Sequence, residues 1–376
     1  MLAICGGDRY DATALPIIYG PINSLVIDGG NALFTVNSPN TVSYQWQHDQ
    51  GIDVFIDIVG SITNTLIFPV ALATHDGLKI RCALTNPNGS VNSTEKELRV
   101  YDNSLGETSW DFETATIVAG ADAVHDNLKV SDIYQATFWY EDGIATDRKA
   151  EIVVDPKGTE GNVVRLWILN AIISTGTKGR IQLDVNNIAI PEMFITQKMY
   201  LPQSMDEYKN YPSQNLWFAI AEFFMGEPGV DDGFRITVDI AKGTGVGQPL
   251  IFFTQGMKKD NGLWKVVWTE FNASYFISFD EWINIEYGYK SGNSINGRFY
   301  MTAKASSESE KTVIADVTNW TYSNKAASDS DSRFMRLANP QKLYTSSTIV
   351  DHMRDNGSLA EIYFNDLNIQ GNWPTG

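Results

Sequence analysis

The run Trp217-Phe218-Ala219-Ile220-Ala221-Glu222-Phe223-Phe224 indicates how the larger part of this chain folds. Side chains alternate between the two faces of a strand, which predicts Trp217, Ala219, Ala221 and Phe223 on one face and the other four residues on the opposite face. Apolar residues on both faces predict a central strand of a layered β-sheet. Because a carboxylate sealed in hydrocarbon is strongly unfavourable, we expect the face with Glu222 to line a groove.

Two other segments extend this prediction. Residues 179–185 alternate Arg180, Gln182 and Asp184 with apolar side chains, and residues 234–240 do the same with Arg235, Thr237 and Asp239. Such alternation is typical of antiparallel strands with one buried face and one polar face. Three such strands side by side predict a concave sheet that carries arginines and carboxylates. That surface suits a sugar polymer.

The composition favours an all-β protein. The chain has 376 residues, of which 12% are aromatic, only 19% are charged and 30 are glycine, so it is long enough for two or three domains rich in turns. The formal net charge is -17, which argues against nucleic acid as a partner because phosphates would be repelled. No apolar run approaches the ~20 residues that a membrane span needs.

The N-terminal region contains few structural signals. Residues 1–22 are predicted to form an arm that docks onto other subunits of an assembly or packs on its own domain. No basic segment followed by an apolar one is present, so we predict no export signal, although residues 2–5 faintly resemble a lipoprotein cleavage box. The two cysteines, Cys5 and Cys82, are interpreted as free thiols that bind no metal.

Residues 23–101 contain short strand-like runs separated by turn formers, which predicts a small β-sandwich. The segments Tyr44-Gln45-Trp46-Gln47 and Asp76-Gly77-Leu78-Lys79-Ile80-Arg81-Cys82 resemble strands C and F of the bacterial and phage immunoglobulin-like family. The resemblance implies a spacer or docking module. The strand B region has no cysteine, so Trp46 and Cys82 are expected to pack without a disulfide.

Residues 102–109 are predicted to be a linker, and residues 110–376 a large two-sheet jelly roll. Three segments of the latter, Arg180-Ile181-Gln182-Leu183, Asn339-Pro340-Gln341-Lys342-Leu343-Tyr344 and Tyr363-Phe364-Asn365-Asp366-Leu367-Asn368-Ile369, resemble strands of the alginate-lyase and heparin-lyase-I type polysaccharide lyases. The predicted fold is therefore an immunoglobulin-like sandwich followed by a concanavalin-like jelly roll.

The same resemblance implies site residues. β-Elimination on a uronate needs a group that neutralises the carboxylate, a base and an acid, and the resemblance implies Arg180, Glu222 and Tyr344 for a lyase. Phe224 lies where those enzymes carry histidine, so we assign catalytic residues only for the lyase alternative. The predicted carbohydrate-binding residues are Arg180, Gln182, Glu222, Phe224, Arg235, Asp239 and Tyr344.

Calcium is a further possibility of this fold. Asp111 and Glu113 lie near the first predicted strand of the jelly roll, and Asp366 lies in the last. Oxygen ligands suit Ca²⁺, so these three carboxylates are a candidate structural site, with ordinary surface charge as the alternative. We predict no other cofactor.

Three functions are compatible with these observations. The first is a non-enzymatic outer structural or adhesion protein, on a phage virion or another extracellular surface, whose jelly roll binds a polysaccharide or host-surface glycan. The second is a secreted polysaccharide lyase, or a glycoside hydrolase with a pair of carboxylates. The third is a structural subunit with a vestigial groove. We favour the first.

Overall fold

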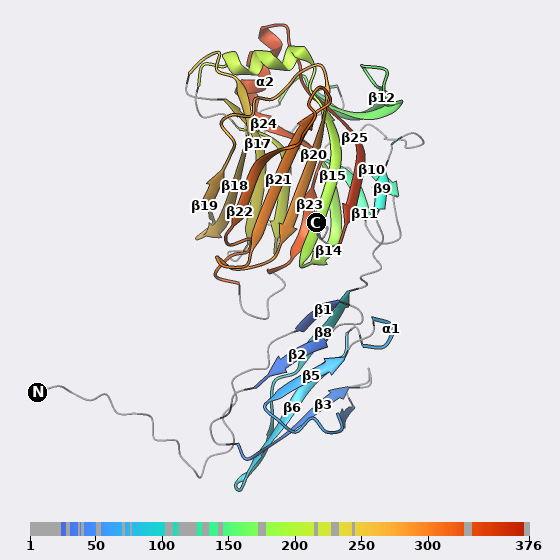
Figure 1. The fold of residues 1–376 in the computed structure, drawn as a ribbon, viewed down its shortest axis with the longest axis vertical. Helices are drawn as coiled ribbons and strands as arrows, with labels where there is room; N and C mark the ends of the chain where they lie inside the picture. Colours follow the sequence, from blue (N-terminus) through green and yellow to red (C-terminus); the bar gives the residue numbers. More distant parts are fainter. Residues whose placement is uncertain are drawn as a thin grey trace, which may run out of the picture. The chain divides into compact units, whose positions relative to one another are not determined.

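The structure, a computed structural model, describes residues 24–27, 31–36, 38, 41–49, 54–69, 72–75, 77–101, 108–110, 112, 126–129, 135–141, 146–171, 178–213, 217–226, 233–242, 245–326 and 333–371. These residues form two compact units, one before Leu105 and one after Ser104. Regular structure within them is almost entirely β-strand (Figure 1). The predicted all-β sandwich class is therefore confirmed. The predicted N-terminal arm, residues 1–22, lies outside the described residues.

The first unit contains a six-stranded sheet and a two-stranded sheet (Figure 1). The order of the larger sheet is β1 (Ser24–Ile27), β8 (Lys96–Tyr101), β6 (Lys79–Asn86), β3 (Ser43–Asp49) and β4 (Phe55–Asp57), with β7 (Gly89–Asn92) paired to β6. The smaller sheet joins β2 (Asn31–Thr35) to β5 (Thr65–Pro69), and α1 (Leu72–His75) follows β5.

The core of this unit forms around Trp46. Its indole is fully buried, packs 6.2 Å from the Phe34 ring and donates a 2.9 Å hydrogen bond to the Thr63 carbonyl. Trp46 lies directly opposite Cys82 on β6. Cys82 is a free, buried cysteine in the same cluster, as expected for Trp46 and Cys82 packing without a bridge. The immunoglobulin-like assignment itself remains a prediction.

The second unit contains two large sheets (Figure 1). The nine-stranded sheet runs β10 (Asp126–Lys129), β11 (Gln135–Glu141), β14 (Lys178–Ile190), β23 (Met335–Asn339), β16 (Phe218–Met225), β17 (Phe234–Lys242), β18 (Leu250–Asp260) and β19 (Leu263–Glu270). Its ninth strand, β24 (Lys342–Ser346), follows β23 and pairs with the same two neighbours, β14 and β16.

The eight-stranded sheet runs β12 (Arg148–Val154), β13 (Asn162–Ile168), β25 (Ala360–Gln370), β15 (Glu192–Tyr200), β20 (Trp282–Lys290), β21 (Arg298–Ala305) and β22 (Thr312–Thr318). Its remaining strand, β9 (Thr108–Trp110), pairs with β25. Thr108 and Ser109, the last described residues of the predicted linker region, thus belong to this sheet. The two sheets are joined at the core by aromatic contacts, such as Phe223 of β16 with Tyr287 and Phe299 of the opposite sheet.

Two helical segments accompany these sheets. The 3-10 helix η1 (Gln203–Asn210) buries Met205 and Tyr208. The α-helix α2 (Ser347–Asp355) follows β24 directly and was not predicted. Neither, nor any other described helix, has the length and apolar character that crossing a membrane requires.

Candidate functional site

A β-bulge in β16 decides which of its side chains share a face. Pairing with β17 shifts by one residue between Ala219 and Ala221, which leaves Ile220 as the extra residue. An extra residue reverses the alternation of side chains beyond it. Trp217 and Ala219 therefore lie on the same face as Glu222, and the predicted strict alternation of residues 217–224 is wrong.

The apolar side of β16 faces the core. Phe218 packs against Tyr208 with a centroid distance of 5.5 Å, and Phe223 contacts Tyr287 at 5.4 Å. Phe224 is only half-buried and lies opposite Arg235 of β17. The strand is central, as predicted, but its two halves are offset by the bulge.

One face of the nine-stranded sheet collects most of the predicted site residues, and we call it the polar face. It carries Arg180, Gln182 and Asp184 from β14, Glu222 and Phe224 from β16, Arg235, Thr237 and Asp239 from β17, and Lys342 and Tyr344 from β24. Cross-strand pairing sets the neighbours. Arg180 lies opposite Tyr344, Tyr344 opposite Ala219, and Ala219 opposite Asp239.

A buried ion pair lies at the middle of the polar face. Arg235 Nη1 lies 3.1 Å from Glu222 Oε1 and forms an ion pair with it, and Lys342 Nζ forms a second ion pair with Glu222 Oε2. The side chains of Glu222 and Lys342 are 3% and 0% exposed. Glu222 was predicted to line a groove, but it is buried. Its charge is tolerated there because two cations neutralise it.

The two charges respond differently to burial. Burial opposes the ionised form of Glu222, but the charges of Lys342 and Arg235 outweigh that effect and lower its pKa. Complete burial lowers the pKa of Lys342 to about 8, although the Glu222 carboxylate opposes this shift. Glu222 therefore stays ionised near neutral pH, whereas Lys342 is closer to losing its proton than an ordinary lysine.

Further buried polar groups surround this pair. Gln182 Nε2 and Asn339 Nδ2 both donate to Asp184 Oδ1, at 2.7 and 2.6 Å. Thr237 Oγ1 donates to Asp239 Oδ2 at 2.9 Å. Burial, with a smaller effect from nearby Glu222, raises the pKa of Asp239 to about 6 despite that hydrogen bond. These groups form the buried part of the polar face.

The more exposed part of the polar face contains a group of cations and aromatic rings, which we call the Arg180 cluster. Its members are Arg180, Lys178, Trp139, Trp217 and Tyr344. The Arg180 guanidinium lies 4.0 Å from the Tyr344 ring centroid and 5.1 Å from that of Trp139 on β11. The Trp217 ring lies 4.5 Å from Tyr344, and Lys178 Nζ lies 5.6 Å from the same ring. Arg180, Trp139 and Trp217 are half-buried, and Lys178 is exposed.

The structure thus brings the predicted binding residues onto one face but adds others. Four of the seven predicted residues are buried, namely Gln182, Glu222, Asp239 and Tyr344, so only Arg180, Phe224 and Arg235 keep a larger accessible share. Sequence reasoning missed Lys342, Asn339, Trp139 and Trp217. The spacing of Lys342 and Tyr344, two residues apart on one strand, was a usable signal because it places both on one face.

The histidines lie elsewhere or outside the described residues. His48 and His75 belong to the first unit, and His352 on α2 pairs with Glu207 at 3.4 Å and packs on Tyr211. His125 is not among the described residues. Tyr344 lies close to Arg180, as a lyase would require, but Phe224 supplies no group that can transfer a proton.

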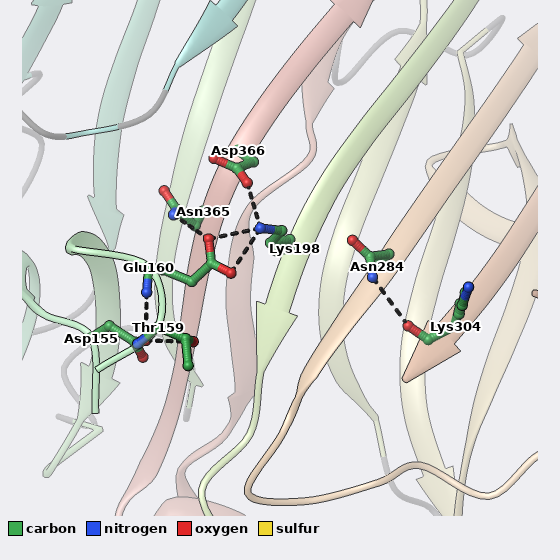
Figure 2. A network of polar contacts seen from close by, with 8 residues as sticks. All are labelled: Asp155, Thr159, Glu160, Lys198, Asn284, Lys304, Asn365 and Asp366. Atoms are coloured by element: carbon green, nitrogen blue, oxygen red, sulfur yellow. Dashed lines mark hydrogen bonds and ion pairs between the residues drawn. The ribbon is translucent and has the colours of Figure 1, made fainter. Parts of the chain in front are cut away.

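The predicted calcium ligands are not brought together within the described residues. Asp111 and Glu113 lie outside them. Asp366 pairs with Lys198 Nζ at 2.8 Å, and the same Nζ contacts both Glu160 oxygens at 2.7 Å (Figure 2). Among the described residues, no group of three or more histidine, cysteine, aspartate or glutamate side chains could hold a metal ion.

Comparison with known proteins gives structural neighbours only. No protein-family profile and no curated protein sequence matches the chain. A mutant of alginate lyase Aly36B in complex with alginate trisaccharide is 14% identical, with a TM-score of 0.42, over 70% of this chain and 97% of the lyase. An endo-β-1,4-glucuronan lyase from the fungus Trichoderma reesei is 12% identical, with a TM-score of 0.40, over 66% and 95%.

A phage protein is also similar. Full-length tailspike protein 2 from Escherichia coli O157:H7 bacteriophage CAB120 is 10% identical, with a TM-score of 0.31, over 73% of this chain and 29% of the tailspike. The neighbours thus include polysaccharide lyases and a phage tailspike. These likenesses assign no activity to this chain.

Proposed function

We propose that the second unit binds an acidic polysaccharide on its polar face and does not cleave it. The observation that carries this proposal is the Arg180 cluster, in which a half-buried guanidinium lies 4.0 Å from the Tyr344 ring centroid and 5.1 Å from that of Trp139, while Trp217 packs against Tyr344. Aromatic faces contact sugar rings through their apolar carbons, and a guanidinium recognises carboxylate or sulfate in a planar, paired geometry.

The charge distribution supports an anionic ligand. The chain has a net charge of -17, so a polyanion would be repelled by most of its surface. The Arg180 cluster differs, because Lys178 and Arg180 both lie against the Tyr344 ring. The nearby carboxylate Glu222 is buried and already neutralised by Lys342 and Arg235. Glu222 would therefore not oppose an acidic sugar at this cluster.

The same geometry argues against cleavage. Lys342 is 5.2 Å from the Tyr344 ring centroid but has no exposed surface and is ion-paired to Glu222. A general base must come within hydrogen-bond reach of the proton that it removes. Phe224 occupies the position where the resemblance implies histidine and cannot serve instead. This arrangement supports the proposal of ligand binding without turnover.

Binding and cleavage can be measured in one set of samples. We expect calorimetric titration to detect alginate, glucuronan or heparin binding that weakens with added salt, with no binding of neutral dextran and no rise in absorbance near 235 nm from unsaturated products. Arg180→Met should reduce affinity about tenfold or more, as a central cation of the site. Lys304→Met, on β21 of the other sheet, is the matched control and should bind as the unaltered chain does. Equal binding by the Arg180 variant would refute the proposal.

A second candidate, a polysaccharide lyase, is favoured by the lowered pKa of Lys342, about 8, beside Tyr344. In that case Lys342 would act as the base after movement away from Glu222, with Tyr344 as the acid and Arg180 on the uronate carboxylate. Absorbance near 235 nm that grows with time, and disappears in Lys342→Met, would establish this reaction in place of simple binding.

The setting that we propose for this binding is an outer surface, either extracellular or on a virion, where the protein serves as an adhesion or structural component. Acidic polysaccharides coat cell surfaces, so a chain that binds them without cutting is suited to attachment. Electron microscopy of a particle that carries this chain, decorated with an antibody to the second unit, would test the setting directly.

A further inference from the structure

A second group of cations and aromatic rings lies at another place on the same sheet, and we call it the Trp264 cluster. Trp264 is on β19, and the Arg235 guanidinium lies 4.4 Å from its ring centroid. Lys259 Nζ of β18 lies 5.9 Å from the same ring, and the Phe224 ring of β16 approaches edge-on at 6.4 Å. Four strands thus contribute to a cluster of the same chemical type as the Arg180 cluster.

The cluster remains partly accessible. Trp264, Arg235, Lys259 and Phe224 are all half-buried. Val266, the neighbour of Trp264 on β19, is 53% exposed. Trp264 therefore presents a partly exposed aromatic ring with the positive charges of Arg235 and Lys259 beside it.

Arg235 retains hydrogen-bonding capacity. Its Nη1 donates to Glu222, and its Nε is buried without a hydrogen-bond partner in the described part of the chain. A guanidinium carries five N–H donors, so pairing with Glu222 still leaves donors on the two terminal nitrogens for another acceptor. Glu222 in turn fixes the orientation of Arg235 toward Trp264, because the carboxylate is itself held by Lys342.

The two clusters are separated by a distance that a short oligosaccharide can span. Cross-strand pairing places Arg180 and Asp239 in the same row of the sheet, three strand spacings apart, with Tyr344 and Ala219 between them. Arg235 lies four residues from Asp239 on β17. Strand spacings of about 4.8 Å and rises of about 3.4 Å per residue place the two arginine Cα atoms on the order of 20 Å apart. One sugar ring cannot reach both clusters, but a polymer can.

We propose that Trp264, Arg235 and Lys259 form a second subsite for an anionic sugar of the polymer that the Arg180 cluster binds. This inference rests on the proposed function, because it concerns the same ligand. Two subsites joined by one chain raise the affinity for long ligands over short ones, since the second contact is made within an existing complex. A polymer would therefore be retained more strongly than its fragments.

A length series of alginate oligosaccharides tests the second subsite on the full chain. In calorimetric titrations the unaltered protein should bind an octasaccharide at least about tenfold more tightly than a trisaccharide. Trp264→Ala should remove most of this gain, and Lys259→Met should reduce it several-fold. Trp217→Ala, in the Arg180 cluster, should instead weaken binding of both lengths. Trp167→Ala, a half-buried tryptophan on β13 of the other sheet, is the matched control.

The outcomes separate this inference from the proposed function. If the unaltered chain binds neither length, the proposed function fails and the second subsite fails with it. If both lengths bind and the gain with length survives in Trp264→Ala and Lys259→Met, the second subsite alone is refuted. Trp264→Phe keeps an aromatic ring and should retain much of the gain, so a loss in Trp264→Ala with recovery in Trp264→Phe supports ring stacking over misfolding.

Discussion

Separating the buried ion pair of Glu222 and Lys342 should destabilise the second unit strongly. Their side chains are 3% and 0% exposed, and removing one partner of such a pair costs about 3–5 kcal/mol because the other charge stays buried. Glu222→Gln deprives Lys342 of its one ion-pair partner among the described residues, so we expect a loss in that range. Lys342→Met should lose less, about 2–3 kcal/mol, because Arg235 still neutralises Glu222.

The loss can be measured by guanidinium unfolding of the full chain at pH 7, followed by tryptophan fluorescence. Trp46 is the only tryptophan before residue 105, so a Trp46→Phe background restricts the signal to the second unit. The double variant, Glu222→Gln with Lys342→Met, should lose about 1–3 kcal/mol less than the sum of the single losses, since the two residues are in contact.

The control is a solvent-exposed pair on the other sheet. Lys311 contacts Glu286 at 2.9 Å, and the lysine side chain is 54% exposed. Lys311→Met should therefore change the free energy of unfolding by less than about 1 kcal/mol. Single losses below about 1 kcal/mol at Glu222 and Lys342, or losses that simply add in the double variant, would show that the pair is not the buried and coupled unit described above.

Three further expectations concern other residues. The pKa of Asp239 is raised to about 6, above an unfolded value of about 3.9, so its contribution to stability is largest below pH ~4 and is lost as the pH rises through 6. Asp239→Asn should flatten this part of the pH–stability curve. In chemical unfolding at pH 7, the same variant should be more stable than the unaltered chain by on the order of 2 kcal/mol. Gly256→Ala should lower the melting temperature in calorimetry by several degrees, because a Cβ there would lie 2.2 Å from the Trp268 ring. Burial raises the pKa of Cys82 to about 11, so in a Cys5→Ser chain mass spectrometry should find no iodoacetamide labelling at pH 8 until the first unit unfolds.

Alternation of polar and apolar residues predicted the strands that have one polar face and one buried apolar face. In residues 179–185 of β14 and 234–240 of β17 every second residue is polar, so the side chains of Arg180 and Arg235 were assigned to the correct face from sequence alone. In β16 nearly all residues are apolar, and the pattern contains no signal that distinguishes one register from another. The bulge at Ile220 depends on how β17, β23 and β24 pair with this strand, which sequence does not reveal.

The buried ion pair was beyond the reach of sequence reasoning for a related reason. In the sequence, Lys342 is a polar residue two positions after Pro340, and none of its sequence neighbours indicates that Glu222 lies beside it. Their contact arises because β24 takes its place between β14 and β16. The helix α2 was missed because nine residues directly after a strand leave little room for a helical pattern to stand out.

The bulge at Ile220 also affects how this strand can be aligned with others. A gap-free alignment to a regular strand can match the facing of side chains on one side of Ile220 only, and on the other side it equates surface positions with interior ones. A deletion of Ile220 would have the same effect in the molecule itself, turning Trp217 inward or Glu222 away from Arg235. Homologues of this chain should therefore be sought with a one-residue insertion allowed at that point.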